Sequence, residues 1–80
     1  MEANEVQEIV AKAFAGGQVE VERDGSHYLI KVVHESFEGM MPVKKQQAVY
    51  ACLNEYIASG AIHAVHIKAY SPSQYDQLKK

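Results

Sequence analysis

Apolar positions in the middle of the chain follow the 3.6-residue period of an α-helix. Five of them recur at positions i, i+3, i+4, i+7 and i+8 and make one stripe: Val49, Cys52, Leu53, Tyr56 and Ile57. The helix is expected to begin near Pro42, whose missing N–H costs nothing in a first turn, and to end at Ser59-Gly60. We therefore expect the stripe to face the core, while Lys44 and Lys45 fall largely off it on the solvated side.

Three other segments alternate between apolar and polar side chains, which is the pattern of β-strands. The first two, residues 18–23 and 27–34, flank Asp24-Gly25, the strongest hairpin signal in the chain, and must be antiparallel. The third, residues 62–70, follows the long helix, so it can pair in parallel with an earlier strand through a right-handed crossover. Its alternation places His63 on the core-facing side.

A first helix is predicted before the hairpin. Asn4 is placed to cap this helix, with Gln7 as its partner in a capping box, and Gly16-Gly17 is placed to end it. Its apolar stripe consists of five residues: Val6, Ile9, Val10, Ala13 and Phe14.

Two short segments complete the chain. Residues 35–41 are expected to form a turn or a brief helix, with Phe37 and Met40 as apolar anchors. Residues 71–74 form a capping box that opens a last helix, which is expected to fray into Lys79 and Lys80.

The order of elements, α-β-β-α-β-α, predicts an α+β fold with a three-stranded mixed sheet whose helices cover one face. Eighty residues make one domain, spanning residues 1–80. The other face of the sheet is expected to be exposed to solvent. Leu29 and Val33 point to it, so we expect these two apolar side chains to be partly exposed or to meet a partner.

The net charge and the cysteine content of the chain argue against several classes of function. A net charge of −2 with both signs interspersed argues against nucleic-acid binding by bulk charge. The single cysteine, Cys52, permits neither an internal disulfide nor a thiolate zinc site, and its place in the apolar stripe predicts a buried, inert thiol. There is no signal-peptide pattern and no stretch long enough to span a bilayer, so we expect a cytoplasmic protein that does not enter membranes.

No residue pattern points to catalysis. Ser26 and His27 are neighbours on an extended segment and point to opposite faces, so they cannot form a nucleophile and base pair by themselves. The glycines at 16 and 17 follow a helix, which is the wrong order for a phosphate-binding loop. We predict that the protein is not an enzyme and has no catalytic residues.

The four histidines are the main functional signal, because imidazole binds transition metals and changes charge near neutral pH. His34 and His66 are expected to be surface residues, and a purely structural role for His63, at the edge of the core, is the alternative to a functional one. His27 and His63 come together if the hairpin loop folds toward the start of the last strand. Two imidazoles alone make an incomplete site, so zinc or cluster iron would need ligands from another molecule.

A second candidate site is the start of the long helix. Lys44 and Lys45 follow the turn that contains Gly39 and Met40, and together they could present cations and backbone N–H groups to phosphates. The alternative is an ordinary solvated helix face, with the acidic residues at 35 and 38 partly cancelling the field.

Four segments in order resemble the BolA family, with its IbaG-type bacterial branch as the closest similarity: DGSHY (residues 24–28), FEGM (37–40), VKKQQAVY (43–50) and IHAVHIKAY (62–70). The resemblance runs from the first helix to the last and implies a fold similar to the type II KH domain. It implies a small cytoplasmic adaptor that pairs with a monothiol glutaredoxin and shares a glutathione-bound [2Fe–2S] cluster. In that picture His63 matches the family's characteristic histidine, and His27 matches the ligand of the hairpin loop.

BolA-like proteins are also linked to transcriptional control, with the turn and the long helix proposed to touch DNA. The basic residue common before the Val-Lys-Lys run is replaced here by Pro42, which weakens that implication without touching the histidines. A DNA-binding regulator acting through Lys44, Lys45, Gly39 and Met40 stays the alternative function. Association of two copies into a homodimer also stays open.

Overall fold

A computed structural model describes residues 2–78. Its elements are α1 (Ala3–Ala13), β1 (Gln18–Asp24), β2 (His27–Val33), the 3-10 helix η1 (Glu35–Phe37), α2 (Pro42–Ala58), β3 (Ala64–Tyr70) and α3 (Pro72–Leu78). This order confirms the predicted α+β fold, and η1 is the brief helix expected after the hairpin. The fraying predicted for the last two residues lies outside the described part of the chain.

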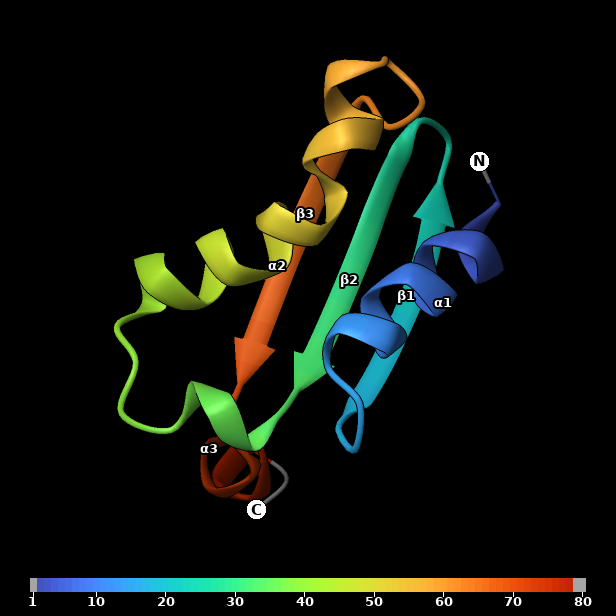
Figure 1. The fold of residues 1–80 in the computed structure, drawn as a ribbon. Coiled ribbons are helices and arrows are strands. Elements are labelled where there is room, and N and C mark those ends of the chain that lie inside the picture. The colour runs from blue at the N-terminus through green and yellow to red at the C-terminus, as the bar shows by residue number, and fades with distance from the viewer. Residues whose placement is uncertain (1, 79–80) are drawn as a thin grey trace.

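The three strands form one mixed sheet in the order β1-β2-β3, with β1 antiparallel and β3 parallel to β2 (Figure 1). The two central residues of the hairpin loop are Gly25 and Ser26, so the prediction that centred the turn on Asp24-Gly25 was one residue early. Gly25 has a φ of +63°, which suits glycine, while no non-glycine residue among those described has a positive φ. A glycine in that first central position is typical of a type II′ hairpin, and it makes Asp24 and His27 a cross-strand pair.

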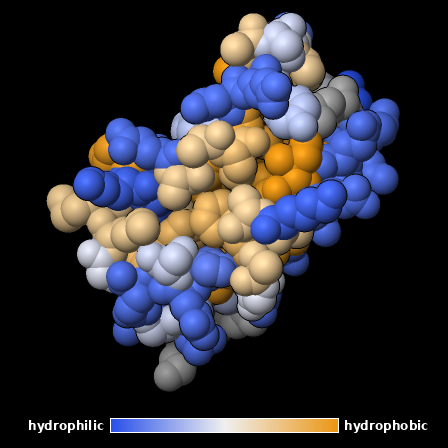
Figure 2. Space-filling view, in the orientation of Figure 1, coloured by the Kyte–Doolittle hydropathy of each residue, from blue (hydrophilic) through white to orange (hydrophobic). Residues whose placement is uncertain are grey.

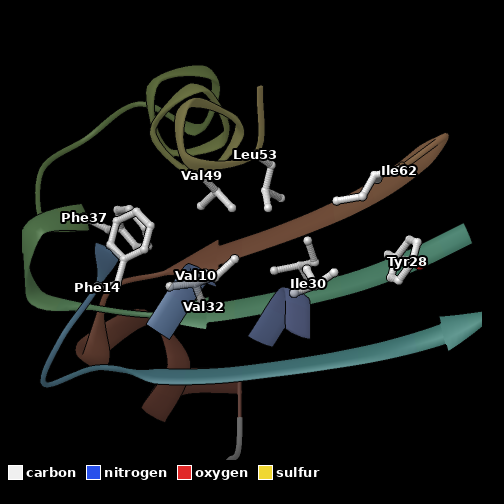
Figure 3. Packing of buried hydrophobic residues seen from close by; sticks show 10 residues of the cluster. Val10, Phe14, Tyr28, Ile30, Val32, Phe37, Val49, Leu53 and Ile62 are labelled. Carbon is white, nitrogen blue, oxygen red and sulfur yellow. The ribbon is translucent and has the colours of Figure 1, made fainter. Parts of the chain in front are cut away.

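Helices α1 and α2 cover one face of the sheet (Figure 1), and the buried side chains of the core gather between them and the strands (Figure 3). Helix α1 contributes Val6 and Val10, α2 contributes Val49 and Leu53, and each of these four side chains is fully buried. They meet a row of β2 side chains that consists of Tyr28, Ile30 and Val32. The 3.6-residue and two-residue periods read from the sequence therefore predict the buried faces of these elements correctly.

The covering layer leaves a seam between α1 and α2. Figure 2 views the molecule from this side and shows apolar surface in the middle, with hydrophilic groups around it. Half-buried apolar residues that pack against the core include Ile9, Cys52 and Tyr56. Cys52 is thus half-buried and not fully buried as expected, but partial burial still raises the pKa of its thiol, and its Sγ donates to the Val49 carbonyl at 2.9 Å.

Helix α3 lies beyond the end of β3, where Gln74 bonds to Lys45 of α2 and Tyr75 reaches Lys31 on the face that α1 and α2 leave uncovered (Figure 1). This position refines the expectation that all helices share one face. The Tyr75 hydroxyl accepts a hydrogen bond from Lys31 Nζ at 3.0 Å, and its ring lies 6.0 Å from that of Tyr70. Val33 is buried, against our prediction; its register partner on β3 is Tyr70, whose ring lies beside Tyr75 of α3. Leu29, which α3 does not reach, is 40% exposed as predicted.

Two other local predictions were wrong. Helix α1 is capped by Glu2 and not by Asn4, because Glu5 accepts a hydrogen bond from the Glu2 backbone N–H at 2.9 Å and the helix has already begun at Ala3. Met40, expected to be an apolar anchor, is 37% exposed, whereas Phe37 is fully buried against Phe14. Among residues 2–78, no helix is long and apolar enough to cross a bilayer.

Candidate functional site

The sheet register brings His27 and His63 to the same end of the sheet. His27 begins β2 and pairs with Ala64, which begins β3 and directly follows His63. Neighbouring strands lie about 4.8 Å apart and consecutive Cα atoms about 3.8 Å apart, so the Cα atoms of the two histidines lie within about 9 Å. Both side chains are exposed. The convergence expected of these two residues is therefore present in the fold.

His27 is held by a well-supported hairpin. Arg23 Nε donates to the Gly25 carbonyl at 2.9 Å, which ties β1 to the turn. The Arg23 guanidinium also lies 5.9 Å from the centre of the Tyr28 ring and 3.9 Å from a carboxylate oxygen of Glu2. Because Tyr28 is buried in the core, the neighbouring His27 must point away from it, to the uncovered face.

His63 is positioned by the loop between α2 and β3. Strand β3 begins at Ala64, two residues later than predicted, and Ile62 takes the buried position with an exposed fraction of 1%. The Ile62 backbone N–H donates to the Tyr56 carbonyl at 3.1 Å, which ties the loop to the end of α2. His63 is consequently exposed, and the prediction that it faces the core was wrong, because the strict alternation of a strand does not extend to residues 62 and 63.

The two histidines offer metal ligands without completing a site. Among residues 2–78, no group of three or more His, Cys, Asp or Glu side chains is arranged to hold a metal ion. Two exposed imidazoles at one end of the sheet nevertheless suit one iron of a [2Fe–2S] cluster, where two histidines can replace two cysteines. The donor set fits such a cluster only if a second molecule supplies the remaining ligands.

The other two histidines lie elsewhere. His66 is exposed on the uncovered face of β3, as predicted. His34 was expected to be a surface residue, but it is half-buried and structural. Its Nδ1 accepts a hydrogen bond from the Ser36 backbone N–H at 3.0 Å, and its Nε2 bonds to the Ala15 carbonyl at 3.1 Å. These bonds join η1 to the loop after α1, a long-range contact without a signal in the sequence pattern.

The candidate nucleic-acid residues do not form one cationic surface. Lys44 is exposed, but Lys45 is only 6% exposed, and its Nζ donates to Gln74 Oε1 at 3.0 Å. The expectation that both lysines are solvated was therefore wrong for Lys45, because α3 packs over it. Gly39 and Met40 are exposed in the loop before α2.

The carboxylate of Glu38 lies in the same loop and accepts a hydrogen bond from Ser73 Oγ at 3.2 Å. The loop that precedes α2 therefore carries a negative charge, which disfavours an approaching phosphate.

The uncovered face of the sheet carries a shallow hollow of about 220 Å³. Leu29 contributes apolar surface to it, with acidic side chains from β1 on one side and cationic side chains from β2 and β3 on the other; the lining residues are Glu20, Glu22, Leu29, Ile30, Lys31, His66 and Lys68. Lys31 forms an ion pair with Glu20, with 2.5 Å between Nζ and Oε2, so part of this charge is already compensated within the chain.

Comparison with known proteins places the chain in a family. The model of the BolA-like protein family matches residues 8–74. The acid stress protein IbaG of Escherichia coli is 49% identical over 80 residues, which is all of this chain and 95% of that protein. An uncharacterised protein from Acinetobacter guillouiae is 41% identical over 75 residues, 94% of this chain and 90% of that protein.

Solved structures agree with this assignment. A BolA homologue from Coxiella burnetii superposes with a TM-score of 0.82 at 26% identity, covering 95% of this chain and 97% of that one. BolA1 from Arabidopsis thaliana superposes with a TM-score of 0.78 at 30% identity, covering 92% and 98%. With the family model, the full-length similarity and the fold in agreement, this chain belongs to the BolA-like family and is of the IbaG type.

Proposed function

We propose that this protein is a non-enzymatic adaptor that binds a monothiol glutaredoxin and shares with it a glutathione-ligated [2Fe–2S] cluster. The observation that carries the proposal is the parallel register of β2 and β3, which sets His27 beside the residue that follows His63. The resemblance to the family also matches His63 to its characteristic histidine and His27 to the ligand of its hairpin loop, which is histidine in one subgroup and cysteine in another. The proposed setting is cytoplasmic iron–sulfur trafficking, iron homeostasis and the stress response, in keeping with the stress-related name of the E. coli relative.

In this proposal the chain's own contribution is two imidazoles at one exposed end of the sheet. His63 and His27 bind one iron, while the glutaredoxin cysteine and the glutathione thiolate bind the other. Replacing cysteine by histidine on one iron raises the potential of a [2Fe–2S] cluster and permits proton-coupled behaviour. Both histidines lie on short, hydrogen-bonded segments, which keeps them in place while the partner approaches.

The alternative, a DNA-binding regulator, is less well supported by the geometry. Phosphate binding by the turn and the long helix would have to rely on Lys44 without Lys45, whose ammonium points to Gln74 and is covered. A single exposed lysine at this place supplies little of the charge neutralisation that drives binding to DNA.

The test is a titration of a cluster-loaded monothiol glutaredoxin with this protein, followed by visible circular dichroism. We expect a new spectrum that saturates at one protein per glutaredoxin, that is lost with His63→Ala and is lost or altered with His27→Ala. His66→Ala is the matched control, since this histidine is exposed on β3 and lies outside the proposed site.

Two outcomes contradict the proposal. An unchanged glutaredoxin spectrum at micromolar concentrations of this protein excludes cluster sharing, and a DNA-binding assay across salt concentrations with Lys44→Ala becomes the next experiment. If a new spectrum forms equally well with His63→Ala, the cluster is held by other residues.

A further inference from the structure

Helix α3 docks on the rest of the fold without fully burying any of its side chains. Of its seven residues, Pro72–Leu78, six are exposed and Tyr75 is half-buried. Burial of apolar surface is the main stabilising contribution to folding, and it is small at this contact. The docked position of α3 therefore depends mostly on polar and aromatic contacts.

The hydrogen bonds that hold α3 lie near the surface. Lys31 Nζ donates to the Tyr75 hydroxyl at 3.0 Å. The Ser73 hydroxyl donates to the Glu38 carboxylate at 3.2 Å. Each such bond contributes little in net terms, because water replaces it when the two groups separate. A helix of seven residues is also unstable by itself in water, so we expect α3 to melt when it detaches.

The contact between α3 and α2 buries a cation beside a neutral partner. Lys45 is only 6% exposed, and its Nζ donates to Gln74 Oε1 at 3.0 Å. Among residues 2–78, no carboxylate forms an ion pair with this ammonium. A buried charge without an opposite charge is less favourable than the same charge in water. Burial of Lys45 therefore opposes the docking of α3.

We propose that α3 is an autoinhibitory latch on the start of α2. While α3 is docked, only Lys44 of the two neighbouring lysines is exposed. When α3 melts and the rest of the fold stays intact, Lys45 also reaches solvent, and the two ammonium groups together bind the phosphates of a nucleic acid. A ligand that binds only this open form shifts the equilibrium toward it.

The latch goes beyond the proposed function and lies away from its site. Helix α3 follows the last residue of β3, whereas His63 precedes the first, so the two features are at opposite ends of that strand. Variants that loosen α3 should therefore share a cluster with the glutaredoxin as well as the wild type does. The latch and the proposed function can fail independently.

The first test measures how fast each lysine of the folded protein is acetylated by an N-hydroxysuccinimide ester, with the products identified by mass spectrometry. We expect Lys45 to react about tenfold more slowly than Lys44, because only the open form exposes its amine. Tyr75→Ala removes the bond from Lys31 and keeps Gln74, so it should speed the reaction of Lys45 several-fold and leave Lys44 unchanged.

Two control variants accompany this test. Gln77→Ala changes an exposed residue of the same helix to another good helix former, so it should leave both rates unchanged. Val6→Ala truncates a fully buried side chain of α1 and destabilises the whole fold. The proposal is overturned if Lys45 reacts as fast in Val6→Ala as in Tyr75→Ala, since global unfolding would then expose it, or if Tyr75→Ala has no effect.

The second test follows the melting of α3 by amide hydrogen exchange. The Tyr75 N–H donates to the Ser71 carbonyl at 3.0 Å, at the start of α3. We expect this amide to exchange through local opening, at a rate that low urea concentrations barely change. The amide of Leu53 in α2 should exchange only on global unfolding, at a rate that rises with urea. Equal protection of the two amides would refute the latch.

The third test measures the inhibition itself, as binding of a random-sequence DNA duplex across low salt concentrations. We expect Tyr75→Ala to bind several-fold more tightly than the wild type, with a salt dependence steeper by about 0.9 for one added phosphate contact. Adding Lys45→Met to Tyr75→Ala should return the affinity to that of the wild type. Equal binding by Tyr75→Ala and the wild type would overturn the autoinhibitory role.

Discussion

Replacing His34 by alanine is expected to destabilise the fold by about 2 kcal/mol, although the sequence pattern marks this residue as an ordinary surface side chain. Its Nδ1 caps η1 through the Ser36 backbone N–H, and such caps contribute about 1 kcal/mol. The bond from Nε2 to the Ala15 carbonyl adds about 1 kcal/mol at most, because this contact is partly solvated. The ring also meets Phe14 edge-on, at 5.5 Å between centroids, a contact worth about 0.5–1 kcal/mol.

The assay is urea unfolding followed by far-UV circular dichroism, with a thermal scan beside it. A loss of about 2 kcal/mol lowers Tm by about 8–16 °C in a domain of this size. His34→Asn should recover about 1 kcal/mol, because its side-chain oxygen still accepts from the Ser36 N–H. His66→Ala, which removes an exposed histidine, should change the free energy of unfolding by less than about 0.5 kcal/mol.

Equal stability of His34→Ala and His66→Ala would refute this reasoning, because His34 would then contribute no more to the fold than an exposed side chain does. The variant also separates stability from function. His34 follows the end of β2 while His27 begins it, so the two residues lie at opposite ends of the strand. Below its Tm, His34→Ala should therefore share a cluster as well as the wild type does.

Two further predictions concern a close backbone approach and the thiol. A Cβ atom on Gly17 would lie 2.3 Å from the Val33 carbonyl oxygen and 2.9 Å from Cδ2 of His34, so Gly17→Ala should lower the free energy of unfolding by about 1–3 kcal/mol in urea melts. A Cβ atom on Gly16 meets no neighbouring atom. Gly16→Ala should therefore cost only the strain of its φ of +88°, about 1 kcal/mol. Because partial burial raises the pKa of Cys52, its thiol stays protonated at neutral pH, and iodoacetamide should alkylate the folded protein several-fold more slowly than the urea-unfolded chain; equal rates would contradict this.

Much of the fold follows from short-range patterns in the chain. The stripe through Val49 and Leu53 and the alternation through Tyr28 and Ile30 identify which side of each element is buried, because helices and strands expose their side chains with fixed periods. Asp24-Gly25 indicates a tight turn, so the first two strands must pair as an antiparallel hairpin. Even so, the exact turn was misplaced by one residue, since Gly25 favours a positive φ at the first central position of the turn and the sequence does not say which turn type the strands require.

The remaining errors come from contacts between residues far apart in the chain. Lys45 is covered because Gln74, 29 residues later, accepts a hydrogen bond from its ammonium, and no periodic pattern records that pair. His34 becomes structural because Ala15, 19 residues earlier, presents a carbonyl to it. Both are polar contacts made when separate elements pack together, and a hydropathy pattern carries no information about their partners.

The candidate site differs from these contacts, because its position depends on the register of the sheet and the register depends on the core. Moving β2 by one residue against its neighbours would turn Tyr28 out of the core and bring His27 into it. Tyr28 is only 3% exposed, so its burial opposes that slip. The same register aligns His27 with Asp24 on one side and with Ala64, hence His63, on the other. A substitution that loosens Tyr28 should therefore disturb the placement of both histidines together.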